Sequence, residues 1–190
     1  MQSPAINDSD LLRIIDNQLA RGVERAGTHL ACRIGCTSCC IGPFPINALD
    51  AERLRKGLHT IAPERAEQLI MRARQAAAEI GGNWRDEQDV FERCAALPCP
   101  ALDPDTGACE LYEFRPIACR TYGPPVRIGD EDLPPCELCF RGGSPQEIEA
   151  CRIEIEDDGI EEILLDALSD QEDTLVALAI TAAADSPDAC

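Results

Sequence analysis

Cysteine is the residue type in this sequence that points to the most specific chemistry. The chain holds twelve, and four of them stand close together as Cys32, Cys36, Cys39 and Cys40. Because one short loop can present several thiolates to one ion, this spacing predicts a site for zinc or for an iron–sulfur cluster. Neighbouring side chains usually diverge, so the adjacent pair predicts two metals or a polynuclear site. The alternative is that one of the pair is a small buried hydrophobe.

A second group of cysteines, Cys99, Cys109 and Cys119, surrounds a turn. The segment 103–107 is rich in turn formers, so we expect a β-hairpin or a knuckle-like turn with Cys99 and Cys109 across from each other. A short helical segment would bring Cys119 back towards them. Three thiolates leave a tetrahedral ion one ligand short, so a metal here would need a ligand from the first loop and would join the two segments. The alternative is three unrelated core cysteines.

Two arginines flank Cys119 at a distance that suits a supporting role. A thiolate-bound metal site is usually anionic, and we expect Arg115 and Arg120 to offset that charge and to donate hydrogen bonds to sulfur. For Arg115, a surface salt bridge to Glu110 or Glu113 is an equal alternative.

The remaining cysteines carry weaker signals. Cys136 and Cys139 form a C-x2-C pair, which can be half of a zinc site, a redox pair or no site at all. Cys151 fits the filling of a core, and nothing orders a terminal thiol at Cys190. Cys94 matches no pattern.

The composition excludes several classes of protein. A net charge of −18 and a pI near 4.3 exclude nucleic acid as the main partner. No run of about 18 apolar residues predicts a membrane span, and the N-terminal residues do not resemble a secretory signal. We therefore expect a cytoplasmic protein, in which cysteines serve as metal ligands or catalytic thiols and not as disulfides. Residues 128–190 hold 18 of the 35 acidic residues and only two arginines, and this acidic region would suit a basic protein partner.

Helical periodicity accounts for most of the rest of the chain. It predicts helices over 10–26, capped by Ser9 or Asp10 and ended by Gly27, and over 47–58 and 63–80. Further helices are expected over 116–122, 144–155 and 160–168. A last helix is expected after a capping-box pattern at 169–172. The segments 28–45 and 124–143 read as irregular.

These elements predict a mainly α fold, a small helical domain around an irregular metal-bound cysteine centre with one short β-hairpin. The predicted division places a cysteine-cluster metal-binding domain at residues 1–143. An acidic C-terminal helical extension at 144–190 would pack on it.

Two segments carry a resemblance to a known family. CRIGCTSCC, followed by CPALDPDTGACELYEFRPIACRTYG, resembles the bacterial cysteine-cluster family described as a zinc- or iron-chelating domain of the CxxCxxCC type. The resemblance covers about residues 29–125, with CELCFRGG as a looser continuation. It implies metal ligands at eight cysteines: Cys32, Cys36, Cys39, Cys40, Cys99, Cys109, Cys119 and, through the looser continuation, Cys136. Cys139 is not assigned.

The sequence thus predicts a cytosolic protein that holds zinc or iron through clustered thiolates, with more than one metal per chain. Zinc is the expected metal, and iron or an iron–sulfur cluster is the alternative. A distant likeness to flagellin lysine-N-methylase implies a second hypothesis, an iron–sulfur enzyme or electron carrier. A third is an interaction module that metal orders and whose acidic surface binds a partner.

Overall fold

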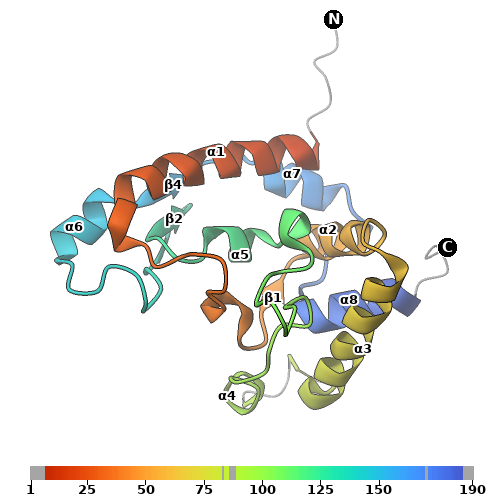
Figure 1. Ribbon diagram of the computed structural model, residues 1–190. Coiled ribbons are helices and arrows are strands. Elements are labelled where there is room, and N and C mark those ends of the chain that lie inside the picture. The colour runs from red at the N-terminus through yellow and green to blue at the C-terminus, as the bar shows by residue number, and fades with distance from the viewer. Residues whose placement is uncertain (1–6, 83, 86–88, 170, 186–190) are drawn as a thin grey trace, which may run out of the picture. The chain divides into compact units, whose positions relative to one another are not determined.

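The computed structural model describes residues 7–82, 84–85, 89–169 and 171–185, and it confirms the predicted mainly α fold (Figure 1). Within these residues the helices are α1 (Asp8–Ala26), α2 (Ala48–Leu58), α3 (Pro63–Ile80), α4 (Val90–Arg93), α5 (Ile117–Thr121), α6 (Pro145–Ala150), α7 (Ile160–Asp166) and α8 (Val176–Asp185). The strands are β1 (Pro45–Ile46), β2 (Val126–Ile128), β3 (Glu131–Leu133), β4 (Ile153–Ile155) and β5 (Thr174–Leu175). Three 3-10 turns, η1 (Gly27–His29), η2 (Ser38–Cys40) and η3 (Tyr112–Phe114), lie between them.

The chain divides into two compact units, each built from two separate segments. Unit 1 takes its described residues from 7–33 and 117–169, and unit 2 takes its own from 34–116 and 171–185. The predicted division at residues 143 and 144 stays a prediction. None of the described helices is both long and apolar enough to cross a membrane.

Unit 1 is organised by α1, which packs against β4, α5 and α7 (Figure 1). Its buried face includes Leu11, Ile15 and Leu19, which recur every four residues as the sequence predicts. The predicted caps Ser9 and Asp10 are wrong. The Asn7 side chain accepts hydrogen bonds from the backbone N–H groups of both residues, so the helix begins at Asp8. Gly27 ends it, as expected, with a φ of 49°.

The small sheet of unit 1 corrects two expectations from the sequence. Its strand order is β3-β2-β4, with β2 antiparallel to β3 and parallel to β4. The segment 124–143, expected to be irregular, contains the hairpin β2–β3, whose two-residue turn holds Gly129 at a φ of 57°. The predicted helix ends at Ala150, because Ile153 and Ile155 are buried on either side of an exposed Glu154, which is the alternation of a strand.

Unit 2 packs α3 and α2 against α8 around an aliphatic core. The predicted helices at 47–58 and 63–80 are confirmed, with Asn47 as cap and Pro63 in the first turn. The capping-box expectation at 169–172 is wrong for the start of α8, because Thr174 and Leu175 form β5, paired with β1. Residue 170 lies outside the described residues.

We predict that Gly22→Ala lowers the free energy of unfolding by about 1 kcal/mol. A Cβ at Gly22 would stand 2.1 Å from Cγ1 of the buried Ile153, where α1 meets β4. Overpacking of about 1–3 kcal/mol should exceed the helix-propensity gain of about 0.5–1 kcal/mol. Urea unfolding followed by circular dichroism measures the change. Gly82→Ala is the control, because nothing lies within 4 Å of its Cβ, and an equal loss in both variants would contradict the prediction.

Candidate metal centre

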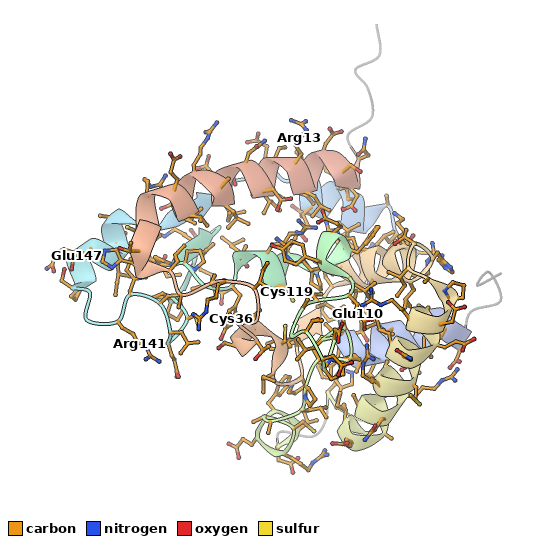
Figure 2. The ribbon with its side chains drawn as sticks, viewed as in Figure 1. Arg13, Cys36, Glu110, Cys119, Arg141 and Glu147 are labelled. Atoms are coloured by element: carbon orange, nitrogen blue, oxygen red, sulfur yellow. The ribbon has the colours of Figure 1, made fainter. Side chains whose placement is uncertain are left out.

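The first cysteine loop brings two sulfur atoms into contact. Residues 38–40 form η2, a single tight turn in which the Cys40 N–H donates to the carbonyl oxygen of Thr37 at 2.8 Å. The Sγ atoms of Cys39 and Cys40 lie 3.8 Å apart, within hydrogen-bonding range of each other. The side chains of this pair therefore converge, although adjacent side chains usually diverge. Cys36 lies in the same unit, in the loop that leads to η2 (Figure 2).

A short run of backbone hydrogen bonds joins this loop to the second group of cysteines. Ile41 forms an antiparallel bridge with Pro98, and the Gly42 N–H donates to Leu97 O at 2.7 Å. The Cys99 N–H donates to Cys40 O, also at 2.7 Å. Residues 40 and 99 are therefore held side by side by their main chains.

The turn before Cys109 is built by Asp103. Its Oδ1 accepts hydrogen bonds from the N–H groups of Asp105, at 2.9 Å, and Thr106, at 3.3 Å. The expected hairpin is a single antiparallel bridge, and the expectation that Cys99 faces Cys109 is wrong. Leu102 pairs with Cys109, because the turn needs residues 103–108 to close, which leaves Cys99 to pair with the first loop.

Close backbone contact also places the Cys36 loop against this turn. Gly107 has a φ of 68°, and a Cβ there would stand 3.5 Å from the Cα of Gly35 and 3.6 Å from Cγ2 of Thr37. The turn that carries Cys109 and the loop that carries Cys36 are therefore neighbours within unit 2.

Helix α3 holds the turn in place through two arginines, which both pair with Glu110 (labelled in Figure 2). Arg72 donates to the carbonyl oxygen of Pro100 at 2.9 Å and forms an ion pair with Glu110. Arg65 pairs with the same Glu110 at 3.2 Å and with Asp103 at 3.3 Å. The Glu110 side chain is only 5% exposed, so these partners are needed to keep a buried carboxylate satisfied.

The thiols of unit 2 differ in pKa, and therefore in whether they are protonated at neutral pH. The hydrogen bond from the Cys40 thiol lowers the pKa of Cys39 to about 6, and the positive charge of Arg115 acts in the same direction. The pKa of Cys40 is raised, first by that hydrogen bond and then by burial and by nearby Cys99 and Cys109. We assign the thiolate to Cys39, because it accepts the hydrogen bond of the pair and the positive charge of Arg115 favours its ionised form. Burial raises the pKa of Cys99 to about 12 and raises that of Cys109.

The two predicted supporting arginines lie in different units. Arg115 stacks its guanidinium 3.8 Å from the centroid of the Tyr112 ring. Its charge helps to lower the pKa of Cys39, and at Cys109 it opposes the larger effect of burial, which raises the pKa. Arg120 belongs to unit 1, where its buried guanidinium pairs with Asp16 at 2.8 Å. Arg115 thus stands near unit 2 thiols, and the role of Arg120 at a metal stays a prediction.

The eight predicted ligands are divided between the units. Unit 2 holds Cys36, Cys39, Cys40, Cys99 and Cys109, and unit 1 holds Cys32, Cys119 and Cys136. Cys94 is buried in a separate apolar cluster of unit 2, and Cys151 packs beside Cys139 in unit 1. Cys190 lies outside the described residues. No disulfide joins any of the eleven described cysteines.

The donor chemistry of unit 2 fits zinc or iron, while its side chains are not gathered around an ion. Among the residues that the structure describes, no three His, Cys, Asp or Glu side chains are placed to hold one metal together. Four thiols nevertheless act on one another electrostatically, Cys39, Cys40, Cys99 and Cys109. Thiolates are ligands for zinc and for iron–sulfur clusters. Rotation of these side chains would be needed to complete a coordination shell.

Comparison with known proteins gives one family. The family model described as "CxxCxxCC: Putative zinc- or iron-chelating domain" matches residues 31–141, more than half of the chain. The match includes cysteines of both units and extends past Cys139, which sequence reasoning left unassigned. No curated protein and no solved structure matches the chain significantly.

We predict that Cys39 is the most reactive thiol of unit 2 in metal-free protein at pH 7. Its pKa of about 6 makes it largely thiolate, whereas the thiol of Cys99, with a pKa of about 12, stays protonated. Iodoacetamide labelling with peptide mass spectrometry gives the rate for each thiol. Cys40→Ala should raise the pKa of Cys39 towards its ordinary value, while Cys40→Ser keeps a donor and should change it less. Equal effects of the two variants would contradict the proposed hydrogen bond.

We also predict that Arg72→Ala loosens the turn at residues 100–110. The change removes the hydrogen bond to Pro100 and one partner of the buried Glu110, at a cost of about 1–3 kcal/mol. Thermal unfolding measures the loss, and labelling of Cys109 should become faster. Arg74→Ala is the matched control on the same helix, since Arg74 pairs with the exposed Asp185.

Proposed function

Because the chain belongs to the CxxCxxCC family of zinc- or iron-chelating domains, we propose that unit 2 holds one zinc or iron ion through Cys39, Cys40, Cys99 and Cys109. The observation that carries the proposal is the backbone hydrogen bond from Cys99 to Cys40 at 2.7 Å. It brings the adjacent thiol pair of one loop to the first thiol of another. The loop of Cys36 lies against the turn before Cys109, so Cys36 is a further candidate donor within the same unit.

The protonation states of these thiols support a binding event that depends on pH. A metal binds thiolates and not thiols. Because the pKa values of Cys40, Cys99 and Cys109 are raised, these thiols are protonated at neutral pH, and a metal must displace their protons. Cys39, with its pKa of about 6, offers the first ready ligand. Binding is therefore expected to strengthen as the pH rises from 6 towards 9, and it requires a reducing environment such as the cytoplasm.

A structural role for the metal is supported by where these thiols lie. Cys99 and Cys109 pack against the main aliphatic core of unit 2, beside residues of α2, α3 and α8. A metal bound to them and to Cys39 and Cys40 would tie the loop at 36–42 to the segment at 97–111. The bound ion would add side-chain cross-links to the backbone hydrogen bonds that join the two segments.

The proposal also includes the identity of the metal. Zinc is our first choice and iron the second, since four thiolates accept either. A colourless protein with zinc by elemental analysis supports the first. A brown protein containing iron and inorganic sulfide would support the iron–sulfur alternative, and with it the enzyme or electron-carrier hypothesis.

The acidic residues of the C-terminal region offer less support for a separate interaction function. Several of them pair within unit 1, since Arg127 contacts Asp132 at 2.6 Å and Glu154 at 3.1 Å. Arg152 likewise contacts Glu149 at 2.9 Å. A basic protein partner for this region stays a prediction from the sequence.

We predict that Cys109→Ser removes one equivalent of metal per chain, whereas Cys94→Ser removes none. A hydroxyl is a poor ligand for these ions at neutral pH, and Cys109 belongs to the four interacting thiols. Cys94 is the matched control, a buried cysteine of the same unit whose sulfur lies 3.8 Å from Glu79 O, so a hydroxyl there keeps a partner. Metal content of anaerobically purified protein provides the measurement.

Circular dichroism of both variants checks that each keeps its helices. Loss of metal from Cys94→Ser with retention in Cys109→Ser would overturn the proposed site. Wild-type protein that contains no zinc or iron when purified anaerobically with added metal would overturn the proposed function.

A further inference from the structure

Unit 1 gathers cysteines of its own around a single glycine. Gly123 has a φ of 123°, and a Cβ at this position would stand 2.8 Å from the Sγ of Cys32. Its carbonyl oxygen accepts a hydrogen bond from the N–H of Cys136 at 3.0 Å. Cys32 and Cys136, which stand about one hundred residues apart in the sequence, therefore both lie against Gly123, and the absence of a side chain at Gly123 makes room for the sulfur of Cys32.

The second cysteine of the C-x2-C pair is held next to Cys32. The Sγ of Cys139 accepts a hydrogen bond from the backbone N–H of Ala31 at 3.5 Å, and the Cys139 N–H donates to Cys136 O at 2.8 Å. The Phe140 N–H donates to His29 O at 2.7 Å, which fixes the two chains alongside each other. Cys139 is 5% exposed. A buried sulfur that accepts a backbone N–H is prepared to carry the negative charge of a bound thiolate.

Cys119 adds a fourth sulfur from the same unit. It lies on α5 (Figure 2), which ends two residues before Gly123. The helix packs against α1, whose last residue, Ala26, leads into the segment that carries Cys32. The short helix therefore leads directly into the residue at which Cys32 and Cys136 meet.

Positive charge is placed on these same loops. Arg33 folds back to donate to Ala31 O at 3.3 Å, and Arg141 donates to Glu137 O at 3.4 Å, inside the C-x2-C turn. Arg141 is one of only two arginines among residues 128–190, which hold 18 acidic residues. A cation at this turn in so acidic a region suits an anionic centre.

From these contacts we infer a second thiolate site for a zinc-class ion in unit 1, formed by Cys32, Cys119, Cys136 and Cys139 and separate from the four thiols of unit 2. The inference rests on the proposed function for the metal class and assigns Cys139, which the sequence left open. It places eight of the twelve cysteines of the chain in two sites of four, each within one unit. Ligation would deprotonate the thiols, and the sulfurs would have to close further around the ion.

The experiment counts metal sites in the full-length protein loaded with cadmium-113. The wild type should give two cadmium resonances in the thiolate region and bind two equivalents of metal. Cys136→Ser/Cys139→Ser should lose one resonance and one equivalent, and Cys99→Ser/Cys109→Ser should lose the other. Cys151→Ser is the control from the same apolar cluster as Cys139 and should lose neither.

The other possible results distinguish the second site in unit 1 from the proposed site in unit 2. If the unit 1 double variant keeps all its metal while the unit 2 double variant loses all of it, the second site is wrong and the proposed function stands. If only the unit 1 variant loses metal, the unit 2 site is wrong and the second site stands. If each of the two double variants loses every ion, one centre that needs both sets of cysteines replaces the two sites.

A measurement on the wild-type protein tests the second site even if one of the variants does not fold. Metal should slow iodoacetamide labelling of Cys136 and Cys32 at least about tenfold, while Cys151 is labelled at the same rate with and without metal. Equal labelling of Cys136 and Cys32 in both states would overturn the second site.

Discussion

The arrangement of thiols in unit 2 depends on a few backbone hydrogen bonds between residues 40–42 and 97–99. Neither loop has enough apolar side chains to fix itself, but the Cys99 N–H and the Gly42 N–H each find a carbonyl oxygen on the opposite segment at 2.7 Å. Main-chain bonds do not depend on side-chain identity, so the side chains at these positions remain available for chemistry. The ion pairs from α3 then act on the far end of the same segment, through Glu110.

Charge explains why the thiols differ from one another although they are chemically identical. A buried thiolate is costly, so desolvation keeps Cys99 and Cys109 protonated, while the contact between Cys39 and Cys40 concentrates the available charge on one sulfur. The positive charge of Arg115 favours the ionised form of that sulfur. The metal-free protein thus keeps one reactive thiolate beside several protonated thiols, and a thiophilic ion that bound them would release their protons.

The sequence predicts elements whose signals are local and misses those that depend on distant partners. The four-residue spacing of Leu11, Ile15 and Leu19 is sufficient for α1, and Pro63 marks the start of α3. The sequence predicts a helix at strand β4 because three residues are too few to show the alternation of a strand, and the strand is defined by its pairing with β2. The cysteine spacing indicated metal chemistry, and the family match supports that reading. It could not show which thiols meet, because the division between the units follows tertiary contacts.

The interleaving of the two units has a consequence for synthesis on the ribosome. The chain passes from unit 1 to unit 2 after residue 33, returns after 116, and enters unit 2 again after 169. Helix α8, which closes the aliphatic core over α2 and α3, is among the last described segments to emerge. Unit 1 can therefore complete its contacts while unit 2 still lacks its final helix and exposes apolar surface. Nascent chains stalled before residue 171 would be the form most exposed to aggregation and to premature oxidation of their cysteines.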